Sequence, residues 1–252
     1  MTFIPNEDYW ITRAIKNIEA DYGDVVSVDS KNKSLIKFGV NTDIDSGITE
    51  TVWEVGGNET FPTGNNIDIV TSTSAADTQE VIIEGHTLSG SDLTFVTQTA
   101  TLNGTADVTL STPLYRANRM YNNGSTDFAG IVTVEDNGTS VNLQVQAGDV
   151  NQSLKCATSL SSTDYWIVTA LDIGVRRTNT AAVDFELQVR EYGKVWRTRY
   201  FMSDSSNAGG KLFQLNPCII IKKNSDIRMV ATSLVNNVGV TASIHGVLAT
   251  TN

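Results

Sequence analysis

From Val25 to the end of the chain, short runs of β-branched and apolar residues alternate with polar ones. Glycine, asparagine, aspartate and serine separate these runs, and a period of two is typical of strands with one buried face. The clearest run is 183–190, in which Val183, Phe185, Leu187 and Val189 should share one face. The pattern predicts an all-β fold with strands at 25–28, 35–38, 51–55, 67–71, 79–85, 93–102, 106–110, 114–121, 130–134, 141–146, 154–159, 165–175, 182–192, 194–202, 212–215, 218–221, 226–233 and 238–248.

The start of the chain has a different period. In residues 7–20 the apolar positions recur every three or four residues, which predicts a short helix with Asn6 as its N-cap and Gly23 as its stop. Its apolar positions are Tyr9 or Trp10, Ile11, Ala14, Ile15 and Ile18. Two roles are open for this helix: it packs on its own domain, or it is an arm that packs on a neighbouring subunit.

Charge and composition suggest a division of the β part. Residues 1–149 hold 7 Lys and Arg and 21 Asp and Glu, a net charge of −14, whereas residues 150–252 hold 11 and 7, a net charge of +4. The small polar stretch 147–153 is the predicted junction. We therefore expect a helical arm at 1–23, an acidic β-rich domain at 24–149, and a β-sandwich of jelly-roll type at 150–252. The opposite charges either serve solubility alone or meet within the molecule or across an assembly. The acidic part disfavours a nucleic-acid partner there.

Candidate chemistry is sparse, and the sequence predicts a protein that is not an enzyme and has no cofactor or metal. His86 and His245 lack a Cys or His at metal-ligand spacing, and no serine lies in a Gly-x-Ser-x-Gly motif. Asp43 and Asp45 permit a calcium site, but the full Asp-x-Asp-x-Asp-Gly loop is absent, so an acidic loop is favoured. Cys156 and Cys218 are expected to be buried free thiols. We expect neither a secretory signal nor a membrane span.

One predicted hairpin concentrates aromatic and basic residues. Tyr192, Trp196, Tyr200 and Phe201 lie beside Arg190, Arg197 and Arg199, and such residues are enriched in the energetically dominant parts of protein interfaces. Alternation puts Val195, Arg197, Arg199 and Phe201 on one side of the second strand, which requires acidic partners. With the aromatic start of the helix, the interface candidates are Tyr9, Trp10, Ile11, Arg190, Trp196, Arg197 and Arg199.

Three blocks of sequence resemble structural proteins of tailed bacteriophages. They are Ile36–Gly47 with Thr51–Gly57, then Val183–Arg197, and finally Lys222–Ser233, in the order found in that family. The family often has a Pro-Ala-Gly-Lys turn where this chain has Leu160–Tyr165, which alters a loop. The resemblance implies a virion-associated β protein that forms symmetric oligomers, often trimers, and supplies no catalytic residues.

Three functions follow in order of preference. The first is a capsid decoration or cement protein that binds the major capsid protein and its own copies, a trimer being favoured, and is assembled in the host cytoplasm. The second is a tail or fibre component that binds a host receptor or glycan. The third, well below both, is a carbohydrate-active enzyme on a β scaffold. The short chain and its helical start favour the first over the second.

Overall fold

The computed structural model describes residues 7–28, 34–176, 181–205 and 209–251, and the N-cap expected at Asn6 lies outside them. The predicted N-terminal helix is confirmed as α1 (Glu7–Tyr22). Gly23 ends it with a φ of 72°, and its N–H donates to Glu19 O at 3.1 Å. Ala14 and Ile18 are buried on this helix, against Tyr165 and Ile167 of the same chain. The helix therefore covers part of a sheet in its own chain.

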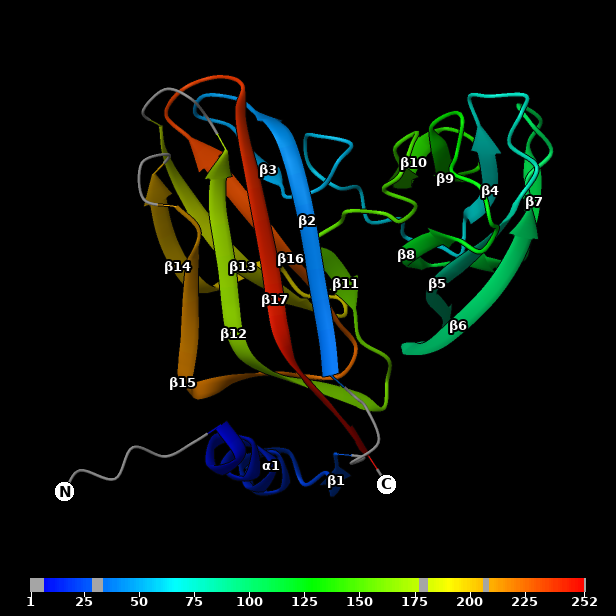
Figure 1. The fold of residues 1–252 in the computed structure, drawn as a ribbon. Coiled ribbons are helices and arrows are strands. Elements are labelled where there is room, and N and C mark those ends of the chain that lie inside the picture. The colour runs from blue at the N-terminus through cyan, green and yellow to red at the C-terminus, as the bar shows by residue number, and fades with distance from the viewer. Residues whose placement is uncertain (1–6, 29–33, 177–180, 206–208, 252) are drawn as a thin grey trace.

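Two sheets stack face to face next to this helix (Figure 1). The first sheet contains β1 (Val26–Ser27), β2 (Ser34–Ile44), β12 (Asp164–Arg176), β15 (Lys211–Ile221) and β17 (Val238–Thr251). The second contains β3 (Thr49–Thr51), β11 (Ala157–Ser159), β13 (Ala182–Glu191), β14 (Arg197–Ser205) and β16 (Ser225–Ser233). We call these two sheets the sandwich.

Alternation explains the core of the sandwich. Val183, Phe185, Leu187 and Val189 of β13 are all buried, as their spacing predicts, and Trp166 faces them from the other sheet as part of the same hydrophobic cluster. All pairings within the two sheets are antiparallel. The predicted all-β class, with one short N-terminal helix and a β-sandwich, is thus confirmed.

A second group of strands lies to one side of the sandwich (Figure 1). One sheet has the order β10-β9-β4-β7 and the other β6-β5-β8, and they enclose a separate hydrophobic cluster around Ile83, Met120 and Leu143. We call residues 59–153 the outer lobe. Its strands are β4 (Ile67–Ser72), β5 (Glu80–Ser89), β6 (Asp92–Thr101), β7 (Val108–Leu114), β8 (Arg116–Asn122), β9 (Val132–Asp136) and β10 (Ser140–Val145).

The strand pairing does not follow the division at residue 149 that the charge pattern suggested. Strand β2 pairs with β17 and β3 with β16, so residues 34–51 share sheets with the C-terminal part of the chain. The predicted domains 24–149 and 150–252 stay a prediction as folding units. The outer lobe retains the acidic character, with 2 Arg and 11 Asp and Glu, a net charge of −9.

The chain leaves the sandwich and returns to it at one place. Trp53 forms an antiparallel bridge with Lys155, and Cys156 N donates to Val52 O at 2.9 Å. Gly39 of β2 crosses over this junction, and a Cβ there would stand 2.2 Å from Val52 O and 2.4 Å from Cys156 N. Only glycine allows three backbone segments to approach so closely.

Several local predictions need correction. The strands expected at 212–215 and 218–221 are one strand, β15, whose register with β12 shifts between Val168 and Ala170. The second strand of the aromatic hairpin begins at Arg197 instead of Lys194, because Gly193 has a φ of 70° and the turn extends further. Asn137 and Gly138, an Asn-Gly pair typical of tight hairpins, join β9 to β10 with positive φ at both residues. Both cysteines are free, but only Cys156 is fully buried, since Cys218 is half-buried beneath α1.

Candidate functional site

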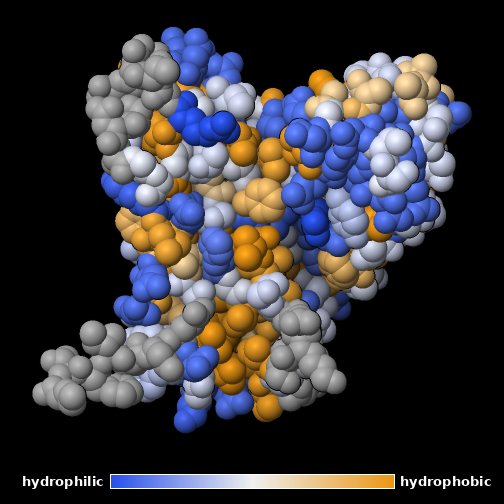
Figure 2. All heavy atoms as spheres, viewed as in Figure 1, coloured by the Kyte–Doolittle hydropathy of each residue, from blue (hydrophilic) through white to orange (hydrophobic). Residues whose placement is uncertain are grey.

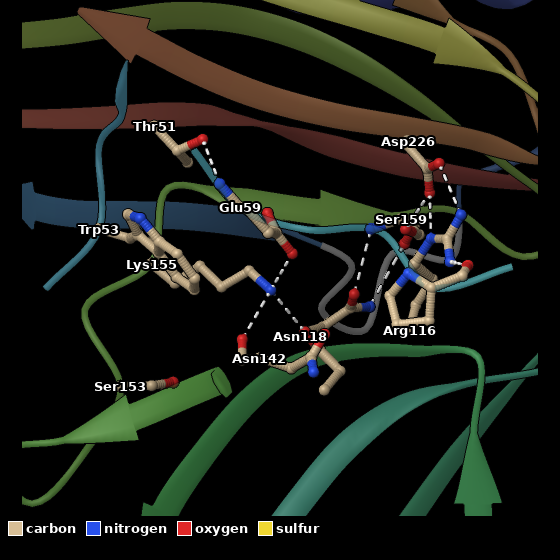
Figure 3. A network of polar contacts seen from close by, with 12 residues as sticks. Thr51, Trp53, Glu59, Arg116, Asn118, Asn142, Ser153, Lys155, Ser159 and Asp226 are labelled. Carbon is tan, nitrogen blue, oxygen red and sulfur yellow. Dashed lines mark hydrogen bonds and ion pairs between the residues drawn. The ribbon is translucent and has the colours of Figure 1, made fainter. Parts of the chain in front are cut away.

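A network of buried polar residues joins the outer lobe to the sandwich (Figure 3). At its centre Arg116, the first residue of β8, forms a two-pronged ion pair with Asp226 of β16. Its Nε lies 2.9 Å from Oδ1, and its Nη2 lies 3.1 Å from Oδ2. Arg116 Nη1 donates to the carbonyl oxygens of Pro62 and Tyr115 at 2.7 and 2.8 Å. The guanidinium therefore has partners on every side, as a buried charge requires.

Asp226 binds two further groups. Arg190 of β13 donates through Nη2 at 2.6 Å and Ser159 donates through Oγ at 2.6 Å. Burial alone would raise the pKa of Asp226, but the hydrogen bond and positive charge of Arg116, together with these donors, outweigh it and hold the pKa below its usual range. The carboxylate is thus ionised and connects three strands.

A second ion pair lies where the chain enters and leaves the outer lobe. Lys155 pairs with Glu59, and its Nζ also donates to Ala117 O at 2.9 Å and Asn142 O at 3.1 Å. Burial raises the pKa of Glu59 while the neighbouring Lys155 opposes the shift. Both side chains are almost fully buried. The Lys155–Glu59 pair is therefore a second buried ion pair between the outer lobe and the sandwich.

The predicted interface residues fall into two groups. Arg190 and Trp196 contribute to the lobe boundary: the Trp196 ring lies edge-on to Phe61 with centroids 5.1 Å apart, and the Arg190 and Arg228 guanidinium carbons stand 4.6 and 4.3 Å from its centroid. Their contacts are therefore within this chain. Arg197 and Arg199 are exposed on β14, and neither forms an ion pair with a described residue.

The helix residues lie on α1, which packs on the first sheet, whereas β14 belongs to the second sheet. Tyr9 is 43% exposed, whereas Trp10 and Ile11 are half-buried. They do not come together with the β14 residues, so the seven candidates do not form one continuous surface.

Sequence reasoning missed Arg116, Asp226, Lys155, Glu59 and Asn118. One signal was available: Arg116 and Arg119 are the only basic residues of the outer lobe, and an isolated arginine inside a predicted strand suggests a buried ion pair. The identity of its partner was not available, because Asp226 is 110 positions away.

Two cavities flank the network. One, of about 310 Å³, lies among Phe61, Tyr115, Arg190 and Tyr192. The other, of about 320 Å³, lies between β2 of the sandwich and β5, β6 and β8 of the outer lobe, and His86 lines it. Burial lowers the pKa of His86 to about 4.

Cys156 and His245, residue types that serve in catalysis or metal binding, each have contacts of their own. Burial raises the pKa of the Cys156 thiol to about 12, and His245 contacts Ser243 Oγ at 2.7 Å. Among the described residues, no three His, Cys, Asp or Glu side chains are grouped as metal ligands. Within the same ranges, no helix has the length and apolar character needed to cross a membrane.

Comparison with known proteins gives little. No protein-family model matches the chain, and no curated protein matches it. Among solved structures, a chain of the T13 viral particle of infectious bursal disease virus is 10% identical over 96% of this chain and 76% of its own, with a TM-score of 0.24. A chain of the VP2 subviral particle of the same virus is 12% identical over 94% and 77%, with a TM-score of 0.23. TM-scores this low carry no argument about fold or function.

Proposed function

We propose that this chain is a non-enzymatic structural protein of a bacteriophage particle that decorates or cements the capsid. One observation carries the proposal. The blocks that resemble phage structural proteins are far apart in sequence, yet they fall on neighbouring strands: β3 pairs with β16 and β16 with β13, while β2 lies in the facing sheet. The resemblance thus covers one physically continuous unit rather than scattered segments.

The exposed side of β14 supports attachment through protein contacts. This strand ends its sheet, and no other described strand pairs with its free edge. Val195, just before β14, is 71% exposed and Phe201 58%, and Arg197 and Arg199 are exposed between them. The register of β14 with β13 shifts between Leu187 and Gln188, so the predicted alternation is broken and Arg197 does not share a face with Phe201. We call these four residues the β14 stripe. An exposed edge with apolar and basic side chains suits a partner that supplies apolar and acidic groups.

The acidic outer lobe is such a surface. Its net charge of −9 complements the β14 stripe, so a head-to-tail contact between copies is our preferred arrangement, with a trimer as the closed form. The major capsid protein would bind elsewhere on the chain, for example at the helix end that carries Tyr9, Trp10 and Ile11. Stable attachment needs an interface of roughly 1,000 Å² or more.

Density of whole particles tests the proposal. We expect the chain over the head surface in tens to hundreds of copies. A few copies confined to the tail would instead support the alternative, a tail or fibre component that binds a host receptor or glycan.

Charge reversal tests the proposed surface. The double variant Arg197→Glu/Arg199→Glu should lose the oligomer in analytical ultracentrifugation and bind particles at least about tenfold less well. The control, Arg176→Glu, reverses an exposed charge at the end of β12 outside the stripe and should behave as the parent chain. If the two variants assemble equally well, the β14 stripe is not an interface.

A further inference from the structure

The cavity between β2 and the outer lobe has a polar interior and an apolar mouth. Its volume of about 320 Å³ lies in the range of small-molecule sites. The polar interior contains Lys37, His86 and Asn118, of which only 8%, 2% and 7% is exposed. The contacts around these three side chains show which of their donor and acceptor atoms are already used.

Asn118 fixes the tautomer of His86. The N–H of Ser159 can only donate, so the Asn118 atom 3.1 Å from it is the oxygen Oδ1. The other terminal atom, Nδ2, therefore donates to His86 Nδ1 at 3.2 Å. The proton of the neutral imidazole then lies on Nε2, and no described residue accepts a hydrogen bond from it. This N–H can therefore donate to a ligand in the cavity that His86 lines.

Lys37 is a second buried donor at the same place. Its Nζ donates to the Asn118 carbonyl oxygen at 2.6 Å, which leaves two of its three N–H groups for other partners. No carboxylate among the described residues lies within ion-pair distance, although Glu84 also lines the cavity. Burial lowers the pKa of Lys37 to about 8. Lys37 and His86 line the same cavity, and an anion there would compensate the buried ammonium group.

The mouth of the cavity is apolar. Ile36 and Phe95 are each 52% exposed and Phe38 37%, and Phe95 lies edge-on to the His86 ring with centroids 5.6 Å apart. Figure 2 shows hydrophobic side chains gathered on the face of the sandwich beside the outer lobe, whose own visible face is mainly hydrophilic. Exposed aromatic groups beside buried donors favour a ligand with one apolar and one acidic end.

We propose that this cavity binds a small carboxylic acid with an aromatic or branched apolar body. The carboxylate accepts hydrogen bonds from Lys37 Nζ and His86 Nε2, and the body lies against Ile36, Phe38 and Phe95. Asp164 also lines the cavity, but its carboxylate already accepts hydrogen bonds from Ser161 Oγ at 2.6 Å and Thr250 Oγ1 at 2.7 Å. This inference is independent of the role in a virus particle.

Calorimetric titration of the full chain tests the site with four probes. We expect 3-phenylpropionate and 4-methylvalerate to bind with a dissociation constant below about 1 mM. Acetate, which lacks the apolar body, and 3-phenylpropan-1-ol, which lacks the charge, should bind at least about tenfold more weakly. Equal binding of the alcohol and the acid, or no saturable binding of either acid, overturns the proposal.

Variants locate the site. Lys37→Met removes the ammonium group while filling its space and should weaken 3-phenylpropionate at least about tenfold. Lys16→Met, at an exposed position of α1 outside the cavity, should leave binding unchanged. Phe95→Ala truncates an exposed ring, keeps the proposal testable if Lys37→Met does not fold, and should also weaken binding. Full binding by a folded Lys37→Met or Phe95→Ala variant contradicts the assignment.

Discussion

Arg116 and Asp226 meet across the boundary between the outer lobe and the sandwich with two parallel N–H···O contacts, at 2.9 and 3.1 Å. Both side chains are more than nine-tenths buried. Asp226→Asn should lower the free energy of unfolding by about 3–5 kcal/mol, because it leaves the buried Arg116 and the half-buried Arg190 without a counter-ion. Urea denaturation measures the loss. The control is Glu191→Gln in the exposed pair with Lys222 at 3.6 Å, which should cost less than about 1 kcal/mol. Similar losses in the two variants would mean that the boundary pair is dispensable.

His86 should make stability depend on pH in the acid range. Its pKa in the folded chain is about 4, below the value of 6.5 for an exposed histidine, so the unfolded chain binds the proton more readily. Stability from this group is complete above pH 6.5 and is lost as the pH falls toward 4, by on the order of 3 kcal/mol. Thermal unfolding from pH 4 to 7 should show this slope in the parent chain and a smaller one in His86→Gln. An unchanged slope in the variant would contradict the prediction.

Glu54 should produce the opposite slope. Burial raises its pKa to about 7 from 4.5 and outweighs the opposing effect of the backbone N–H groups of Glu54 and Leu154. Stability from burying the neutral acid is present below pH 4.5 and is lost as the pH rises through 7. Glu54→Gln should therefore stabilise the chain at pH 8, by up to about 3 kcal/mol. Asp107→Asn, at an exposed position, is the control and should shift stability little. No gain at pH 8 would show that Glu54 is solvated.

The packing of the helix provides a fourth test. Ile18 is fully buried against Tyr165 and Ala249, so Ile18→Ala should cost about 2–5 kcal/mol in chemical denaturation. Tyr9→Ala removes a side chain that is 43% exposed and should cost much less. If the helix is also an attachment arm, Tyr9→Ala should weaken particle binding while stability stays nearly constant. A small effect of Ile18→Ala would mean that α1 is not held on its own sheet.

The crossing of β2 over the junction gives the sharpest steric prediction. Gly39→Ala places a methyl group 2.2 Å from Val52 O, and the chain must move apart to accept it. We expect a loss of about 3 kcal/mol or more, the upper end for overpacking. Gly210→Ala is a suitable control, because its Cβ would meet nothing closer than 3.4 Å. Circular dichroism with urea titration distinguishes the two outcomes, and equal stability of both variants would contradict the close approach.

Local features of the fold were predictable from sequence, and long-range ones were not. The alternation in β13 and the three- to four-residue spacing of Ala14 and Ile18 both depend on neighbours in the chain, so sequence alone located the strand and the helix. The pairing of β2 with β17 joins segments from opposite ends of the chain, and nothing local specifies it. The net charges of the two parts suggested a boundary near residue 149, because the outer lobe is acidic. Net charge carries no information about which strands pair.

The predicted interface residues show the same dependence on contacts that are distant in sequence. Arg197 and Arg199 are exposed, but the prediction that they share one side with Phe201 is wrong, because the register of β14 with β13 shifts between Leu187 and Gln188. Alternation within one strand cannot reveal such a shift, which depends on the partner strand. Arg190 and Trp196 were predicted as interface candidates, and their contacts in the structure are with Asp226 and Phe61 of the same chain. Aromatic and basic character marks a contact surface without saying whether the contact is within one chain or between two.

The junction at Trp53 and Lys155 has a consequence for how such a protein can change. The outer lobe begins and ends at adjacent backbone positions, held by one bridge and by the hydrogen bond from Cys156 to Val52. The lobe is therefore an insertion into the strand order of the sandwich, because β2 and β3 before it pair with β17 and β16 after it. Its removal would leave that order intact but would strip Asp226 and Lys155 of their buried partners Arg116 and Glu59.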